Sequence, residues 1–183
     1  MDQYTLVPSD GLTVGGDAIP VQDAYTPHSS CFGCGPEHPD GLRIKSYRIA
    51  DGLEARVTLP QKYSAFPGVI SGGILSTIFD CHGNWTAGLA LMDEACLTKP
   101  VLTMTVRLDT QFKSPASPGQ PLIIKSQVLR IQHPGDEADD GRVRSKDAVD
   151  VAMEIAHVTR TNATQIIARC EGTFKKHGAM RVF

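Results

Sequence analysis

The chain has 183 residues, of which 41% are apolar and 21% charged, as expected of one globular domain with its own hydrophobic core. Its 18 basic and 20 acidic side chains give a formal net charge of -2, which argues against a general nucleic-acid or membrane-surface binder, because such proteins carry a basic patch. No apolar run approaches the ~18 residues that a membrane-spanning helix needs.

The first segment, residues 1–40, predicts an irregular arm laid over a domain at 41–183. It is rich in Pro, Gly, Asp and Ser and shows no sustained period, with room for a short turn of helix. Its start lacks the basic residues and apolar stretch of a secretion signal. The five cysteines form an odd, scattered set, which fits a reducing compartment, so we expect a cytoplasmic protein.

A hairpin and a long helix are expected next. Residues 42–49 and 53–59 alternate between apolar and polar side chains, and Ala50-Asp51-Gly52 is the turn between them. After a loop that contains two prolines, the sequence predicts an apolar helix from about Gly72 to Met92.

Beyond Pro100 the pattern returns to period two. In the segment 102–113, one face carries Leu102, Met104, Val106, Leu108, Thr110 and Phe112. Further strands are expected at 121–132, 148–160 and 164–176, joined by a charged, solvated loop at 134–147 and a tighter turn at 161–164. Strands grouped beside a single helix indicate the α+β class, with an antiparallel sheet curled around the helix.

The helix has two arcs when its residues are placed 100° apart. The apolar arc, which should fill the concavity of the sheet, consists of Ile74, Leu75, Ile78, Phe79, His82, Trp85 and Leu89. The opposite arc is small and polar, so that another surface can approach its backbone, and consists of Gly73, Ser76, Thr77, Asp80, Asn84, Ala87 and Gly88. Asp80 therefore has Thr77 and Asn84 as neighbours one turn away.

Gly72, Gly73 and Asp80 are the candidates for chemistry on this helix. Paired glycines at a helix N-terminus leave backbone N–H groups open to a close ligand, and the helix dipole favours negative charge there. A carboxylate inside an otherwise apolar helix costs free energy unless it has a function. Together the three residues indicate an oxyanion donor and a catalytic carboxylate. The structural alternative is an aspartate that pairs with a partner subunit.

Two neighbours of Asp80 are expected to have structural roles. Residues two apart on a helix point ~200° apart, so His82 lies in the apolar arc and favours a hydrogen-bonded core histidine over a dyad with Asp80. Cys81 has no basic activator nearby in the sequence, so we expect a packed thiol rather than a nucleophile.

The arm contains four residues of zinc-ligand type within eleven positions. They are His28, Cys31, Cys34 and His38, and the Cys-x-x-Cys spacing suits zinc. Structural zinc sites usually join two separated ligand pairs, whereas these four residues share one Pro/Gly-rich loop. We therefore expect a tight packing turn and no metal.

Three segments of the chain match one family pattern. They read Pro67-Gly-Val-Ile-Ser-Gly-Gly-Ile-Leu-Ser-Thr-Ile-Phe-Asp80, Phe112-Lys-Ser-Pro-Ala-Ser-Pro-Gly-Gln-Pro-Leu122 and Cys31-Phe-Gly-Cys-Gly-Pro-Glu-His-Pro-Asp-Gly-Leu42. Together they resemble the hotdog-fold acyl-CoA thioesterases of the phenylacetyl-CoA (PaaI) type, over roughly residues 31–176. The resemblance implies a hotdog fold, in which an antiparallel sheet wraps around one long central helix, and no cofactor.

The resemblance also implies roles for individual residues. Gly72 matches the glycine whose N–H polarises the thioester carbonyl, Asp80 the carboxylate that acts as general base or nucleophile, and Thr105 a hydroxyl that helps to hold the attacking water. The residues expected to contact substrate around them are Ser71, Gly73, Thr77 and Asn84. The chain departs from the family where Ser71 replaces the usual His before the glycines and where Ala65 stands near an Asn or Gln of some members.

Spacing along the helix predicts a homodimer. Gly72 and Asp80 are eight residues apart, which is ~12 Å along one helix and too far for both to reach one thioester carbonyl. Two antiparallel helices from two subunits supply both groups, which gives two sites in a symmetric interface. The long strand at 102–113 would otherwise leave an unprotected edge, so we expect the two sheets to join edge to edge. Whether two dimers join into a tetramer stays open.

The function expected from these features is hydrolysis of an acyl-CoA thioester to free acid and coenzyme A. Two alternatives remain. A hotdog hydratase or dehydratase acting on an enoyl or hydroxyacyl thioester would need a histidine paired with the acid. A non-catalytic acyl-thioester binder stays open because Ser71 replaces the usual histidine.

Overall fold

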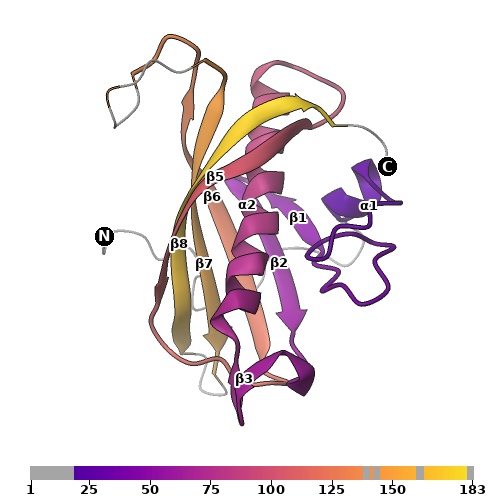
Figure 1. Cartoon of the computed structure of the whole chain (residues 1–183), viewed down its shortest axis with the longest axis vertical. Helices are drawn as coiled ribbons and strands as arrows, with labels where there is room; N and C mark the ends of the chain where they lie inside the picture. Colours follow the sequence, from indigo (N-terminus) through magenta and orange to yellow (C-terminus); the bar gives the residue numbers. More distant parts are fainter. Residues whose placement is uncertain (1–18, 138–140, 142–144, 160–162, 181–183) are drawn as a thin grey trace.

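The computed structural model describes residues 19–137, 141, 145–159 and 163–180 (Figure 1). The helical elements of this part are α1 (Val21–Tyr25), the 3-10 turn η1 (Gln61–Tyr63) and α2 (Gly72–Glu94). Its strands are β1 (Ser46–Ile49), β2 (Gly52–Thr58), β3 (Ser64–Phe66), β4 (Val69–Ile70), β5 (Val101–Phe112), β6 (Pro121–Gln132), β7 (Ala148–Val158) and β8 (Thr164–Ala179). No helix among these is long and apolar enough to cross a membrane.

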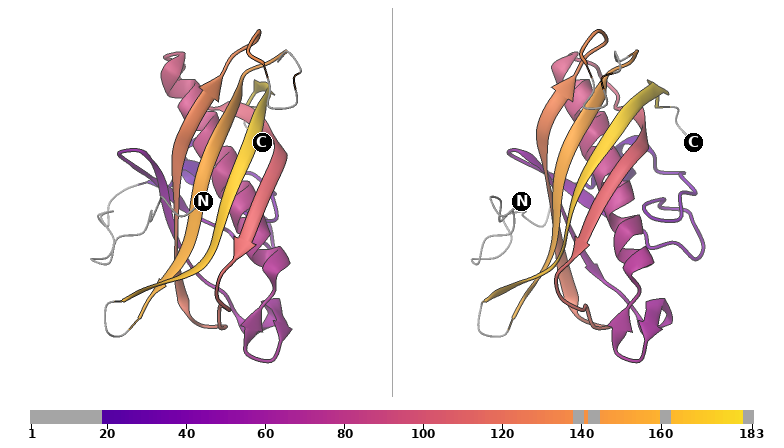
Figure 2. Two further views of the ribbon diagram at one scale, coloured as in Figure 1. Left: turned by 90° about the vertical axis from the view of Figure 1, so that its left-hand side faces the viewer. Right: turned by 60° about the vertical axis from the view of Figure 1, so that its left-hand side comes forward.

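One curled sheet holds the fold together. In the order β1-β2-β6-β7-β8-β5, six strands form this sheet, and every neighbouring pair is antiparallel. The sheet curls around α2, and α1 with the loop that follows it lies beside α2, away from β7 (Figures 1 and 2). The predicted α+β class, with an antiparallel sheet around one long helix, is confirmed.

The apolar arc of α2 forms the centre of the core, as its periodicity predicts. Ile78 and Phe79 are fully buried, and Leu75, Trp85 and Leu89 are nearly so. Burying a side chain of this size stabilises the fold by ~1.5–3 kcal/mol, so this arc fixes how the helix lies in the sheet.

His82 is a core histidine, as predicted. The ring is fully buried, with Nε2 3.2 Å from the Leu53 carbonyl oxygen and Nδ1 2.9 Å from the Ser46 hydroxyl. Burial lowers the pKa of His82 to about 4, so the imidazole is neutral near pH 7. Because a carbonyl only accepts, Nε2 carries the proton and Nδ1 accepts from Ser46. Both ring nitrogens are thus committed to the core.

The small arc of α2 lies partly under β5. Ala87 is fully buried, and a Cβ added to Gly88 would lie 2.5 Å from the carbonyl oxygen of Val101. The surface that approaches the backbone of this half of the arc is therefore a strand of the same chain.

The prediction that one face of 102–113 carries Leu102, Met104, Val106, Leu108, Thr110 and Phe112 does not hold along the whole strand. β5 pairs with β8 through register shifts between Leu102 and Thr103 and between Thr105 and Arg107, and such bulges change which side chains point inward. Thr103 is buried, whereas Met104 and Val106 are 55% and 63% exposed. The exposed pair lies on β5, the strand at the edge of the sheet.

Some boundaries differ from the predicted ones. β1 begins at Ser46 rather than 42, because the N–H groups of Leu42 and Ile44 bond to the carbonyls of Phe32 and Gly33 in the preceding loop. The segments predicted at 134–147 and 161–164 lie partly outside the described residues. The division into an arm at 1–40 and a domain at 41–183 stays a prediction, since residues 1–18 are also outside them.

Candidate active site

A hydrogen-bonded network joins α2 to β5 around Asp80. Thr105 on β5 donates its hydroxyl proton to Oδ1 of Asp80. Asn84, one turn after Asp80, donates from Nδ2 to the Thr105 hydroxyl at 2.8 Å and to the Asp80 carbonyl at 3.0 Å. Thr103 in turn donates to Oδ1 of Asn84 at 3.0 Å. Each side chain in the row is oriented by the next, so the carboxylate is held in one position.

The carboxylate of Asp80 has one oxygen available for chemistry. Oδ1 accepts from Thr105, and within the described residues Oδ2 has no hydrogen-bond partner. Asp80 is only half-buried, so Oδ2 is within reach of water or a ligand. An oriented, partly exposed carboxylate of this kind suits a general base or a nucleophile.

Asp80 lines a cavity of about 200 Å³. Its wall includes Asn84 and Thr103 from the network, together with Cys31, Cys34, Cys81 and Trp85. The loop after α1 therefore closes one side of the space beside Asp80.

The N-terminus of α2 leads into a different hollow, of about 420 Å³, which Gly72 lines together with Phe66 and Phe112. Ser71 stands at the N-cap without a side-chain cap hydrogen bond, so its hydroxyl does not occupy the open N–H groups of the first turn. A Cβ added to Gly72 would lie 3.1 Å from Cζ of Phe112, which places the ring against the helix start.

The sequence-predicted site residues thus fall into two groups. Asp80, Thr105 and Asn84 are in direct contact. Ser71, Gly72 and Gly73 are together at the start of the helix, and Gly72 lines a hollow that Asp80 does not line. Thr77 stands between the groups and bonds back to the Gly73 carbonyl at 3.0 Å. Within one chain, the structure does not bring the predicted oxyanion donor to the predicted base.

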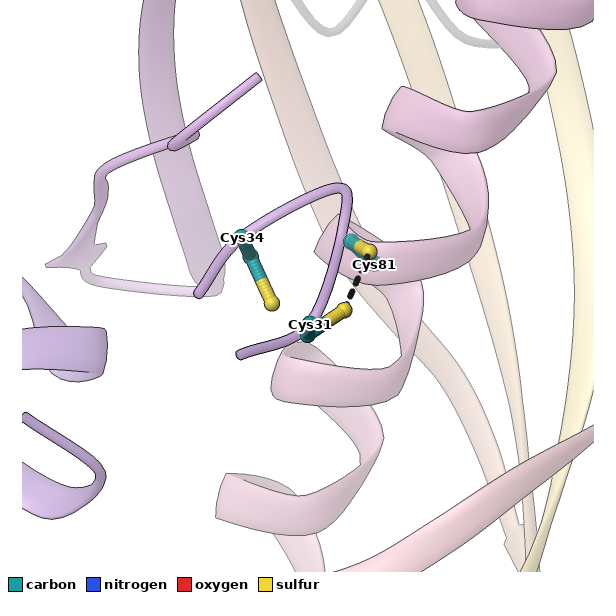
Figure 3. A group of neighbouring side chains, drawn as sticks. All are labelled: Cys31, Cys34 and Cys81. Atoms are coloured by element: carbon teal, nitrogen blue, oxygen red, sulfur yellow. Dashed lines mark hydrogen bonds between the residues drawn. The ribbon is translucent and has the colours of Figure 1, made fainter. Parts of the chain in front are cut away.

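Two features of the site escaped the sequence reasoning. Thr103 orients Asn84, and its place opposite α2 depends on a bulge that alternation alone does not predict. Cys81 is a buried thiol, as expected, and its sulfur also lies close to those of Cys31 and Cys34 (Figure 3). A combined search for cysteines on the helix and in the arm could have suggested that grouping.

The four-residue zinc set predicted as the alternative in the arm does not form. His28 is exposed and bonds Glu37 at 2.7 Å, and His38 accepts from the Asp40 N–H at 3.1 Å. Neither histidine belongs to the group of cysteine sulfurs.

The fold is that of solved thioesterase-superfamily structures. The match to a thioesterase superfamily protein from Shewanella loihica covers 85% of this chain and 98% of that protein, with 22% sequence identity and a TM-score of 0.56. The match to a Streptococcus mutans protein bound to acetyl-CoA covers 75% of this chain and 91% of that protein, with 12% sequence identity and a TM-score of 0.53. The match to the E. coli PaaI protein of the phenylacetic acid degradation operon covers 76% of this chain and 83% of that protein, with 16% sequence identity and a TM-score of 0.53.

Searches against protein-family models and against curated proteins found no match. Because the solved structures share only 12–22% sequence identity with this chain, the likeness shows the fold alone. The chain has the hotdog fold that its resemblance to the PaaI-type thioesterases implies, and this expectation is confirmed. What the chain does with that fold has to be argued from its own site.

Proposed function

We propose that the chain hydrolyses an acyl-CoA thioester to a free acid and coenzyme A. The observation that carries this proposal is the row Asn84–Thr105–Asp80, which holds a carboxylate with one unoccupied oxygen at the edge of a cavity. The uncapped glycines at the start of α2 supply the second requirement, a set of N–H groups for a developing oxyanion. The fold is shared with a protein whose structure contains acetyl-CoA, which supports the substrate class.

A homodimer would complete the site. Gly72 and Asp80 lie ~12 Å apart along one helix, and they line separate hollows. An antiparallel second copy of α2 would bring the Gly72 of each subunit toward the Asp80 of the other. The dimer would then have two equivalent sites. The exposed apolar side chains of Met104 and Val106 on the unpaired edge of β5 favour edge-to-edge joining of two sheets.

The chemistry then follows from the two groups. The thioester carbonyl oxygen accepts a hydrogen bond from the N–H of Gly72, which strengthens as the oxyanion forms, aided by the helix dipole. Asp80 takes a proton from a water molecule as that water attacks the carbonyl carbon, and Thr105 holds the carboxylate in place. The C–S bond breaks in the second step, and coenzyme A leaves as a thiolate that is then protonated.

The runner-up enzyme activity, hydration or dehydration of an acyl thioester, lacks its histidine at this site. His82 uses both ring nitrogens in the core and lies on the opposite arc from Asp80. A non-catalytic acyl-thioester binder differs from the proposed hydrolase only in the outcome of an activity assay.

The test is a thiol-release assay over a panel of acyl-CoA esters, comparing the wild type with Asp80→Asn. We expect a loss of ~10²–10⁴ in kcat with retained fold, the range for removal of a general base. The matched control is Asp93→Asn, since Asp93 lies on the same helix and pairs with Arg48 at 2.7 Å outside the cavity. Hydrolysis by Asp80→Asn at the rate of Asp93→Asn, or no hydrolysis by the wild type, would overturn the proposal.

A further inference from the structure

Three cysteine sulfurs converge where the loop after α1 crosses α2. Cys31 and Cys34 come from that loop and Cys81 from the helix, and their side chains point toward one another (Figure 3). The three Sγ atoms lie within 4.8 Å of one another, and those of Cys31 and Cys81 are 3.7 Å apart. A tetrahedral zinc site with Zn–S bonds of ~2.3 Å places its sulfurs ~3.8 Å apart. The cluster is close to the size that such a site needs.

The loop is shaped to bring its backbone against the sulfurs. A Cβ added to Gly33 would lie 2.3 Å from Sγ of Cys81, and one added to Gly35 would lie 2.4 Å from the backbone nitrogen of Cys31. The N–H of Gly35 bonds to the Cys31 carbonyl at 2.8 Å and closes the turn. A larger residue at Gly33 would force the loop away from α2, and one at Gly35 would open the turn that carries Cys31 and Cys34.

Donor groups are aimed at the sulfurs. The indole N–H of Trp85 donates to Sγ of Cys34 at 3.4 Å. The backbone N–H groups of Gly33 and Cys34 are also directed at the Cys31 sulfur. N–H groups directed at sulfur stabilise thiolates, and they are the surroundings that metal-bound cysteines require.

We propose that Cys31, Cys34 and Cys81 bind a Zn²⁺ ion through three thiolates, with a water molecule from the adjoining cavity as the fourth ligand. An all-sulfur donor set selects a thiophilic cation over Mg²⁺ or Ca²⁺. Among the described residues, no further His, Cys, Asp or Glu joins the group, so its fourth position is open. All three cysteines line the cavity that Asp80 also lines, and the cavity supplies the water.

The ion would fasten the loop to α2 at the residue next to Asp80. Apart from α1, the described chain before β1 contains no helix or strand, and its contacts with α2 include the cysteine cluster and the Trp85–Cys34 bond. Binding through three thiolates requires the thiol protons of all three cysteines to leave, and the ion offsets the cost of ionising them. The site is therefore one that positions the wall of the cavity and takes no part in bond cleavage.

The test uses the full chain, purified under reducing conditions, with elemental analysis and Co²⁺ substitution. We expect about one zinc per chain, and an intense thiolate-to-cobalt charge-transfer absorption after exchange for Co²⁺. Cys31→Ser should lose both signals, and because Cys31 is exposed, this change should leave the fold intact. The control is Cys96→Ser, an exposed cysteine outside the cluster, which should keep both.

A second readout comes from Trp85, the one tryptophan in the sequence. Adding Zn²⁺ to chelator-treated protein should shift its emission in the wild type and in Cys96→Ser, and not in Cys31→Ser. The proposal is overturned if the wild type binds no more zinc or cobalt than Cys31→Ser. It is equally overturned if thiol titration of the protein as purified finds a disulfide within the cluster.

Discussion

Replacing Gly72 by proline would remove the proposed oxyanion donor, the N–H of residue 72, and change little else in the structure. Gly72 is the first residue of α2, where proline is well tolerated because the N–H at that position has no partner within the helix. Ser71 before it has φ -60° and ψ 132°, the extended conformation that a residue preceding proline adopts. The substitution therefore deletes one hydrogen-bond donor without breaking the helix.

The expected loss follows from the value of one oxyanion donor. Removing such a donor typically lowers kcat by ~10²–10³. The new ring also meets Phe112, since a Cβ at position 72 would lie 3.1 Å from its Cζ. Gly72→Ala makes that same contact but keeps the N–H, so the ratio of kcat between Gly72→Ala and Gly72→Pro isolates the donor. A ratio within a few-fold of one in the thiol-release assay would refute the assignment.

Mixing two inactive variants tests whether the sites are shared between subunits. In a mixed dimer of Gly72→Pro and Asp80→Asn, one site has both defects and the other has an intact glycine and an intact aspartate. After co-refolding, about one quarter of wild-type activity should return, because half of the dimers are mixed and one of their two sites is complete. If each site lay within one chain, mixing would restore nothing.

Further predictions concern the groups around the site. Thr105→Val should lower kcat by ~10- to 100-fold, because it removes a hydrogen bond to a carboxylate, and Thr105→Ser should restore most of the rate. His82→Ala should destabilise the fold by ~2–4 kcal/mol in thermal or urea unfolding while part of the activity remains, since it empties a buried site and leaves Ser46 without its acceptor. Gly88→Ala should lower Tm by several degrees, because its Cβ would lie 2.5 Å from a backbone oxygen of β5. Val106→Lys should give a folded, inactive monomer in sedimentation; a dimer with full activity would count against the edge-to-edge arrangement.

Local sequence patterns were sufficient to predict the core elements. The helix at 72–92 appears as Gly72–Glu94, and the strand at 121–132 has the predicted bounds. The helix carries an apolar arc that recurs every three to four residues, and the strand is a short segment rich in Leu, Ile and Val, so both can be recognised without tertiary information. The contact between Asp80 and Asn84 follows in the same way, from a spacing of one helical turn.

The other features of the fold and of the candidate site depend on tertiary contacts that no local sequence pattern encodes. The inward side of β5 is decided by bulges opposite β8, so alternation misassigned Met104 and Val106. The cysteine cluster joins positions 31 and 81 through a loop without periodicity, and its path is set by close approaches at glycine. Thr105 was predicted from the family resemblance, and the spacing of residues alone would not have selected it.

Adjacent residues of β5 face two different environments. Thr105 points inward and holds the carboxylate of Asp80, while Val106 is exposed on the edge of the sheet. In the proposed dimer, a subunit that docks on this edge would contact the strand that also holds the carboxylate of Asp80, so association and activity would be coupled. By mass action, such a protein would lose specific activity on dilution and regain it on concentration, so that its own abundance regulates it.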